Sequence, residues 1–449
     1  ARPRSDQLRA RALSIFTWIG HCMTVHETAN GRGYTSTYIV LGPGVPGMLF
    51  QPTVRNDRAS IGVLVMHPFS NDLGHIAGHH LAARGYTVLC ANPHTVGTHD
   101  SPYLIEDQAP DVALGVAFLR NHSEIRSVVL FGHSAGGPLM SFYQAVAEHG
   151  PGICQGPEKI WRCPDSLSDL PAADGIILMD SHGAYGFVTL TYVDPSIVDE
   201  QDPTRRDHTL DMYDERNGYL ADGARYSPDF VSRFVTAQGE RHNRLIAQAE
   251  DRWARIQAGQ GIYADDEPFL VHGVNSRIWM PDLQIQSRTR GAHPLLHADG
   301  SVTTEIVRSV RRPSGNPPGT RSYKSALVGI SVRQFLSSHA LRTTPDYALG
   351  EDFIRGVDWA SSSTSTPTNM AHLSVPTIIM PMTGHYFLVT DEIIFEHAGS
   401  ADKQLVFVDG ASHGGTTCHA CERTPGEFGD TAQTMFNYLE RWLAERFVH

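Results

Sequence analysis

The chain has 449 residues, a length that predicts one large domain with an insertion, or two to three domains. Its formal net charge of −12 argues against a nucleic-acid partner or an anionic membrane surface. Hydrophobic residues at 41% and charged residues at 19% are ordinary for a globular protein, and no segment approaches the roughly 18 apolar residues of a membrane span. We therefore expect a soluble protein, with a cytoplasmic location favoured over secretion.

The six cysteines leave the compartment open. Cys154 and Cys163 lie in a loop rich in proline and glycine, and Cys418 and Cys421 are close in sequence. Each pair could form a disulfide or remain as free thiols. A zinc site at Cys418 and Cys421 is not favoured, because the chain has no second CxxC motif.

The first half of the chain predicts an α/β fold. Residues 1–33 are expected to form an N-terminal helical segment, with apolar residues at helical spacing over 5–27, and an antiparallel strand pair follows. Apolar runs of strand length then alternate with helical patterns, at 61–66, 72–83, 86–91, 110–121, 128–131, 138–148 and 175–179. This alternation, with continuous Val, Ile and Leu strands, predicts a mostly parallel sheet covered by helices on both faces.

The alternation stops after Asp180 and resumes only with strands at 375–380 and 405–408 and a closing amphipathic helix over 431–446. We interpret residues 186–369 as a cap inserted before the penultimate strand, of mixed α and β structure. Such an insertion would lie at the edge of the sheet where ligands bind in open α/β folds. Within it, residues 228–258 predict one or two helices and residues 293–310 a hairpin.

The sequence Gly132-His133-Ser134-Ala135-Gly136 carries the strongest functional signal. It follows an apolar strand and opens a helical pattern, which is the context of a nucleophile at a sharp strand-to-helix turn. Glycines two residues on either side of Ser134 suit a tight turn that tolerates almost no Cβ. The serine hydroxyl would then stand clear of the sheet, and the N–H of Ala135 would face a developing oxyanion.

These residues resemble the α/β-hydrolase family over residues 34–185 and 370–449. Two weaker signatures support the resemblance: the loop Val408–Gly414 after the last predicted strand, and Val375–Met380, which resembles the penultimate strand. The resemblance implies an α/β-hydrolase core and places the catalytic histidine on that loop, at His413. His413 would activate Ser134, because a free hydroxyl is a poor nucleophile at neutral pH.

The acid of the predicted triad has two candidates. Many family members carry it just after the strand that matches Val375–Met380, but this chain has His385 at about that place and no carboxylate before Asp391. Some relatives place the acid at the end of the preceding strand, where this chain has Asp180. We favour Asp180, with Asp391 as the alternative, since the acid must reach the far nitrogen of the imidazole and hold its tautomer.

The oxyanion hole is expected to combine the N–H of Ala135 with one from the loop after strand 61–66. That loop reads His67-Pro68-Phe69-Ser70. Proline has no N–H, so Phe69 is the predicted second donor. A metal site at His75 and His79, four residues apart on a predicted helix, is not favoured because the glutamate of a zincin motif is missing.

Together these patterns predict a serine hydrolase that cleaves a carboxylic ester, a lactone or an activated amide through an acyl-enzyme. No metal or organic cofactor is expected, and the partner is a small-molecule ester-like substrate. Two alternatives remain open: a C–C bond hydrolase with the same triad, and a non-catalytic binding protein on a hydrolase fold. The sequence does not indicate the substrate or the oligomeric state.

Overall fold

The computed structural model describes residues 26–27, 33–54, 56–97, 103–220, 222–274, 276–315 and 327–448. The helix predicted over residues 5–27 lies outside this part of the chain, apart from its last two residues. These two residues form a short strand, β1, which pairs antiparallel with β2, so the helical prediction is wrong there. The pairing joins them to the main sheet.

The described elements alternate between strands and helices in the first half of the chain and again near its end. The strands are β1 His26–Glu27, β2 Tyr34–Gly42, β3 Val45–Pro52, β4 Ile61–Met66, β5 Thr87–Ala91, β6 Ser127–His133, β7 Gly175–Met179, β8 Tyr219–Leu220, β9 Gly223–Ala224, β10 Pro268–His272, β11 Arg288–Leu296, β12 Val302–Arg308, β13 Leu327–Ser331, β14 Thr343–Leu349, β15 Ile354–Val357, β16 Thr377–Met380, β17 Lys403–Leu405 and β18 Phe407–Val408. The α-helices are α2 Ile76–Ala83, α3 Ile105–Asn121, α4 Gly136–His149, α5 Tyr185–Tyr192, α6 Pro228–Gln257, α8 Val332–Gln334, α9 Thr366–Met370, α10 Leu388–His397 and α11 Thr431–Phe447.

The main sheet has nine strands in the order β1-β2-β3-β5-β4-β6-β7-β16-β17. The strands from β5 to β17 pair in parallel, and the N-terminal strands pair antiparallel. Strands β4, β5 and β7 are buried along their whole length, as expected for parallel strands covered on both faces. The predicted α/β class and the mostly parallel sheet are confirmed.

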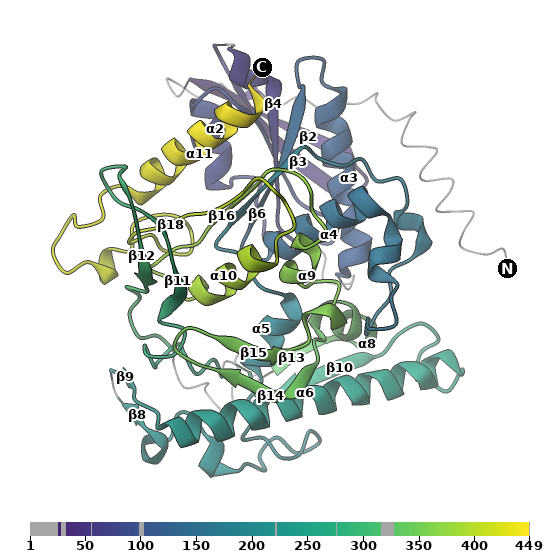
Figure 1. Cartoon of the computed structure of the whole chain (residues 1–449). Helices are drawn as coiled ribbons and strands as arrows, with labels where there is room; N and C mark the ends of the chain where they lie inside the picture. The colour runs from purple at the N-terminus through teal and green to yellow at the C-terminus, as the bar shows by residue number, and fades with distance from the viewer. Residues whose placement is uncertain are drawn as a thin grey trace.

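Side chains of the sheet alternate between two hydrophobic cores because successive residues of a strand point to opposite faces. In β4, Val63 and Val65 pack with the apolar faces of α2 and α11, whereas Leu64 and Met66 pack with α3 and α4. Figure 1 shows α2 and α11 on one side of the sheet and α3 and α4 on the other. The layers follow directly from the period of two in an apolar strand.

Two helices begin at residues other than those predicted. Helix α2 begins at Ile76 rather than at residue 72, because the side chain of His75 accepts a hydrogen bond from the N–H of Ala77 and caps the helix. Helix α3 begins at Ile105, so Pro110 lies inside the helix instead of at its start. Proline removes one helical N–H, and the remaining backbone bonds continue the helix past it.

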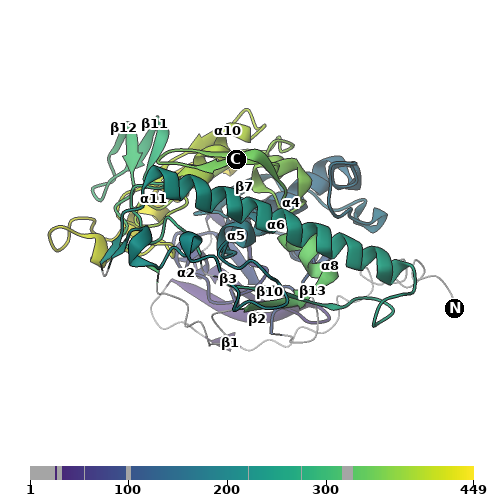
Figure 2. The same ribbon diagram turned by 90° about the horizontal axis from the view of Figure 1, so that it is seen from below.

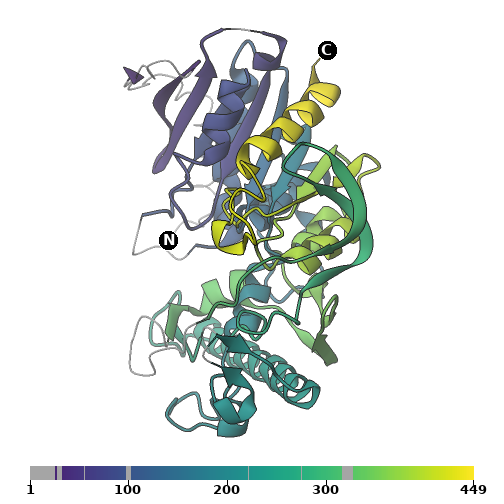
Figure 3. The same ribbon diagram turned by 90° about the vertical axis from the view of Figure 1, so that its left-hand side faces the viewer.

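Residues 186–369, the predicted cap, form one long helix and several small sheets. Residues 228–257 are a single helix, α6, which runs across the molecule (Figures 1 and 2) and lies at the opposite end from α11 in Figure 1. Figure 3 shows the main sheet in the upper half and α6 with the small strands in the lower half. The predicted hairpin is present as β11 and β12, and β11 also pairs in parallel with β18. The hairpin is therefore joined to the strand that precedes the His413 loop.

Both cysteine pairs form disulfides, Cys154–Cys163 and Cys418–Cys421. The second bridge lies just beyond the His413 loop, where the N–H of Cys418 also donates to the carbonyl of Gly410. Loop and bridge thus form one cross-linked segment. A search of the described helices finds none that is both long and apolar enough to cross a lipid bilayer.

Candidate active site

Ser134 lies at a turn between β6 and α4 with a φ of 56°, in the left-handed region that is strained for a residue with a Cβ. Its N–H donates to the carbonyl of Met179 in β7, which ties the turn to the neighbouring strand. A Cβ at Gly132 would lie 2.7 Å from the carbonyl oxygen of Gly136, and a Cβ at Gly136 would lie 2.7 Å from that of Met66. The two glycines are therefore required by close backbone contacts, as the spacing predicted.

The structure brings Ser134, His413 and Asp180 together. The Oγ atom of Ser134 lies 2.9 Å from Nε2 of His413, and Nδ1 of His413 lies 2.5 Å from Oδ2 of Asp180. A carboxylate beside Nδ1 fixes the proton on that nitrogen and leaves Nε2 free to accept the serine proton. The arrangement is that of a nucleophile, a general base and an orienting acid.

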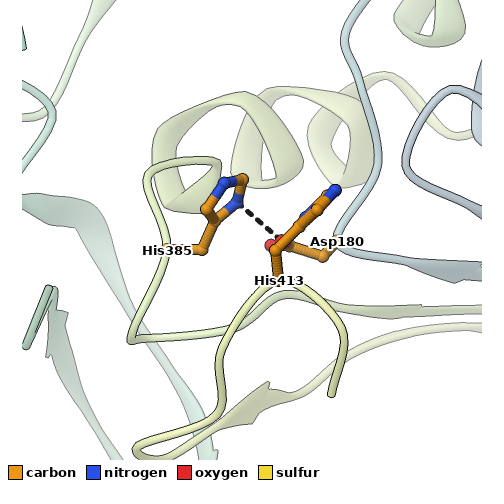
Figure 4. Close-up of side chains that lie close together, drawn as sticks. All are labelled: Asp180, His385 and His413. Atoms are coloured by element: carbon orange, nitrogen blue, oxygen red, sulfur yellow. Dashed lines mark hydrogen bonds and ion pairs between the residues drawn. The ribbon is translucent and has the colours of Figure 1, made fainter. Parts of the chain in front are cut away.

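Asp180 is fully buried at the end of β7, with a φ of 44°. Its Oδ1 accepts a hydrogen bond from the N–H of Met382, and its Oδ2 contacts two histidines. Figure 4 shows both rings, His385 and His413, close to the carboxylate. Burial opposes ionisation of Asp180, but the two histidines outweigh it and hold the pKa of Asp180 below its usual value.

His385 was not predicted as a site residue, although it was noted at the place where the acid usually lies. Its Nδ1 is 2.7 Å from Oδ2 of Asp180, though without the alignment of a hydrogen bond, and its ring stacks on His413 with centroids 4.2 Å apart. Burial lowers the pKa of His385 against the opposing effect of Asp180, so the ring is neutral. A neutral ring in this position carries its proton on Nδ1, facing the carboxylate.

Asp391, the alternative acid, lies in the first turn of α10 and does not contact His413. Its Oδ1 accepts a hydrogen bond from the N–H of Ser181, and its Oδ2 has no partner among the described residues. Burial, followed by the negative charge of Asp180, raises the pKa of Asp391 well above its usual value. Burial and the charge of Asp180 therefore favour the protonated form of Asp391, beside the carboxylate that contacts His413.

His182 is a further site residue that the sequence reasoning missed. Its Nε2 lies 3.2 Å from Oγ of Ser134, on a second side of the nucleophile, and its buried Nδ1 has no partner among the described residues. Burial, followed by the proximity of His413, lowers the pKa of His182 well below its usual value. When the Ser134 proton points at His413, Oγ accepts a hydrogen bond from Nε2–H of this neutral ring.

Two more histidines, His75 and His133, form a chain of hydrogen bonds that ends at the backbone of His413. Nδ1 of His75 accepts from the backbone, so its Nε2–H donates to Nδ1 of His133, at 3.1 Å. Nε2–H of His133 then donates to the carbonyl of His413, at 2.8 Å. Burial, with a further contribution from His413, lowers the pKa of His133 to about 4. These hydrogen bonds between neutral rings hold the backbone of His413 in place.

The predicted oxyanion donors differ in their surroundings. Ala135 is the N-cap residue of α4, and its N–H has no acceptor in the part of the chain that the structure describes. The N–H of Phe69 points instead at Nδ1 of His67 in the same loop, at 3.2 Å, and the N–H of Ser70 shares that acceptor. The N–H of Phe69, the predicted second donor, therefore already has an acceptor in this structure.

The two histidines that the sequence analysis considered as a metal site, His75 and His79, do not point toward a common position. His75 points to His133, whereas Nδ1 of His79 lies 2.8 Å from the hydroxyl of Tyr34. Among the described residues, the one group of histidines and carboxylates with metal-ligand spacing is Asp180, His385 and His413. Those residues already contact one another in the arrangement described above.

The strand order, the two helical layers and the serine between β6 and α4 define the α/β-hydrolase fold. No family model and no curated protein sequence matches the chain. Among solved structures, the chain resembles DcsB in complex with its substrate analogue, with 9% identity, a TM-score of 0.43, and coverage of 96% of this chain and 100% of that one.

Two further solved structures have similar scores. A soluble variant of monoglyceride lipase from Saccharomyces cerevisiae has 12% identity and a TM-score of 0.38, with 96% of each chain covered. Brefeldin A esterase, a bacterial homologue of human hormone sensitive lipase, has 10% identity and a TM-score of 0.37, with 99% of this chain and 87% of that one covered. The fold assignment itself rests on the topology of the sheet.

Proposed function

We propose that the protein is a serine hydrolase that cleaves carboxylic esters through an acyl-enzyme. One observation carries the proposal: a continuous chain of contacts from Oγ of Ser134 through His413 to the buried carboxylate of Asp180. Such a chain makes a hydroxyl nucleophilic at neutral pH.

In the first half of the reaction, Oγ of Ser134 attacks the ester carbonyl while its proton moves to Nε2 of His413. Asp180 stabilises the imidazolium that forms. The N–H of Ala135 faces the oxyanion, and the N–H of Phe69 remains a predicted second donor that must exchange His67 for the substrate oxygen. The carbon–oxygen bond to the alcohol then breaks, and His413 gives the alcohol its proton.

In the second half, water attacks the acyl-enzyme and gives a proton to His413. The bond between the acyl carbon and Oγ breaks, the acid leaves, and the proton returns to Ser134. Nε2–H of His182 contacts Oγ throughout, so it stabilises negative charge on that oxygen each time a bond to it forms or breaks.

A fluorophosphonate probe tests the proposal, because it labels only a serine that a base has activated. We expect labelling of the wild-type protein, detected by intact mass, and none of Ser134→Ala. Hydrolysis of p-nitrophenyl esters of varied acyl length should show a burst of p-nitrophenol followed by a slower steady rate. A folded wild-type protein that is neither labelled nor active on any ester would overturn the proposal and favour a binding protein on the same fold.

A further inference from the structure

Three arginine side chains in residues 186–369 are almost completely buried: Arg241, Arg277 and Arg311, at 0%, 7% and 7% exposure. Arg241 makes a two-pronged ion pair with Glu200 and also donates to two backbone carbonyls. Arg311 donates to three backbone carbonyls. Arg241 is therefore compensated by a carboxylate and two carbonyls, and Arg311 by three carbonyls, although the Nε of Arg311 also has no partner among the described residues.

Arg277 lacks this compensation. Its Nη1 donates to the hydroxyl of Tyr386, at 2.5 Å. No carboxylate of the described residues lies within 4.0 Å of its guanidinium, and its buried Nε has no partner there. Its Cζ lies 4.1 Å from the ring centroid of Tyr192 and 5.3 Å from that of Tyr386.

The ring of Tyr192 lies over the guanidinium, and Tyr386 contacts the guanidinium at one edge through its hydroxyl, so the other edge is the place for a ligand. One edge ends in Nη1, which Tyr386 occupies. The other edge, with Nε and Nη2, makes no hydrogen bond to a side chain or carbonyl of the described residues. An edge with two parallel N–H groups matches the two oxygens of a carboxylate.

Arg277 lies beside the proposed site. Its partner Tyr386 directly follows His385 in sequence, and the two rings are 3.9 Å apart. His385 in turn contacts Asp180. The charge of Arg277 is also close enough to contribute to the lowered pKa values of both His182 and His385, after burial and His413.

We propose that Arg277 binds a carboxylate of the substrate, so that the preferred substrates are esters that carry a free carboxylate near the scissile bond. The proposal rests on the hydrolase function proposed above. It follows from the cost of a buried cation without a counter-charge, which a bound anion would remove. The edge of the guanidinium then fixes the substrate in a defined orientation against Ser134.

The surrounding charges favour a carboxylate over a phosphate. Burial favours the neutral forms of His182 and His385. The charges that act on Tyr386 are the cations Arg277 and Arg311 and the anion Asp180, so one positive charge is unmatched and one monoanion neutralises it. A phosphate monoester carries up to two charges and is usually held by more than one cation or by a helix N-terminus.

Two substrate series test the proposal by placing the carboxylate on either side of the ester. The first consists of monoethyl esters of linear dicarboxylic acids of about four to eight carbons, with ethyl esters of the matching monocarboxylic acids as neutral controls. The second compares 4-acetoxybenzoate with its methyl ester. In one series we expect kcat/KM to favour the anionic substrate by about 10- to 100-fold, the range of a charge-assisted hydrogen-bonded pair.

The variant Arg277→Met should abolish this preference, because kcat/KM for the anionic esters falls to the level of the neutral esters. Arg277→Lys keeps the charge but loses the two-pronged edge, so we expect an intermediate preference. Arg355→Met removes an exposed positive charge from β15 in the same insertion and should leave the preference unchanged. Equal kcat/KM for anionic and neutral substrates in the wild-type enzyme would overturn the proposal.

Failure of the hydrolase function would look different, because no ester of either charge would be cleaved and no fluorophosphonate label would attach. Calorimetry with the Ser134→Ala protein gives a readout without turnover. We expect a dicarboxylate of the preferred length to bind it and to lose at least tenfold in affinity when Arg277→Met is added. Unchanged affinity would contradict the proposal.

The melting temperature separates ligand binding from a structural role. If Arg277 serves the substrate, Arg277→Met removes an uncompensated cation and should keep or raise the melting temperature of the free protein. Added dicarboxylate should raise the melting temperature of the wild type and not that of the variant. A large drop in the melting temperature of free Arg277→Met, with the substrate preference retained in Arg277→Lys and Arg277→Met, would assign the residue to the fold instead.

Discussion

The sheet and the insertion each bring one buried charge to the site, and they treat it differently. The sheet supplies Asp180, whose carboxylate is contacted by His385, His413 and the N–H of Met382. The insertion supplies Arg277, whose guanidinium has one phenol as its hydrogen-bond partner among the described residues. A charge that the fold compensates can orient a neighbouring group, whereas a charge left uncompensated favours an incoming ion of opposite sign. The compensated charge of Asp180 suits a residue that orients its neighbours, and the uncompensated charge of Arg277 suits recognition of a ligand.

The largest expected effect concerns the proposed nucleophile and base, which belong to the α/β core. Ser134→Ala and His413→Ala should each lower kcat for a p-nitrophenyl ester by about 10⁴-fold or more, because nucleophile and base act as a unit. The double variant should cost little more than either single variant. Additive losses, measured by steady-state kinetics, would contradict a shared role.

The two buried aspartates sharpen the comparison within the sheet. Asp180→Asn should lower kcat by about 10²- to 10⁴-fold, because the amide no longer fixes the tautomer of His413. Asp391→Asn should change kcat by less than about threefold. Near-wild-type turnover of Asp180→Asn would remove the assignment of the acid.

Asp391→Asn should also raise stability at neutral pH. Since the pKa of Asp391 is raised in the folded protein, its favourable contribution is complete only below its usual value of 3.8 and is lost as pH rises through the raised value. The amide copies the neutral acid and removes this loss. Thermal unfolding from pH 4 upward should therefore show a gain in melting temperature that grows with pH, and a constant difference would contradict it.

His182 tests whether contact with Oγ matters for turnover. His182→Ala should lower kcat by about 10- to 100-fold with little change in KM, since it removes one donor from the reacting oxygen. His182→Gln keeps an N–H donor and should recover part of the loss. Equal kinetics of the alanine and glutamine variants would indicate a packing role.

His385 should have a smaller effect, through the acid and not through the substrate. His385→Ala removes a group that lowers the pKa of Asp180, so the pKa of Asp180 rises. We expect a loss of about 5- to 30-fold in kcat and a shift of the acidic limb of the pH–rate profile to higher pH. An unchanged pH profile would mean that His385 only fills space.

The smallest effect lies in the insertion, away from the reaction. His242 in α6 is fully buried, and neither ring nitrogen has a partner among the described residues. Burial is the main cause that lowers its pKa to about 3, so only the unfolded chain takes up this proton between about pH 6.5 and pH 3. Its contribution to stability is therefore present above pH 6.5 and is lost as pH falls.

His242→Leu should raise stability at pH 7 by about 1–3 kcal/mol, because it removes unsatisfied buried polar atoms. It should also weaken the decline in stability towards acid, by about 2 kcal/mol between pH 6.5 and pH 5. Chemical denaturation at both pH values measures the two quantities. A parallel loss of stability in wild type and variant would contradict the pH argument.

The core of the fold and three site residues could be predicted because their signals are local. Ser134 and Asp180 directly follow β6 and β7, neighbouring parallel strands of the main sheet whose carboxyl ends meet at one edge, and His413 lies on the loop after β18. Asp180 was the favoured acid because some relatives of the α/β-hydrolase family carry the acid at the end of that strand, within reach of the far imidazole nitrogen. His182 gave the same kind of signal, two residues beyond Asp180, but one histidine among 24 carries little weight without its distance to the serine.

Other features depend on contacts that no local pattern encodes. The prediction of Phe69 as an oxyanion donor took no account of the His67 side chain, whose Nδ1 accepts the Phe69 N–H. Arg277 gave no sequence signal at all, because an unpaired arginine can be recognised only when every neighbour is known. Its site is assembled from α5, the segment before β11 and the loop after β16, which lie far apart in the sequence.

The parallel pairing of β11 with β18 restricts how a substrate of the proposed hydrolase could reach Ser134. Leu295 and Leu296 lie beside Phe407 and Val408, and the N–H of Asp409 donates to the carbonyl of Leu296. If residues 186–369 moved away as one rigid body, the pairing of β11 with β18 would break or the His413 loop would be displaced. Entry must therefore use smaller, local movements that leave the hairpin docked, and crosslinking β11 to β18 should not slow turnover.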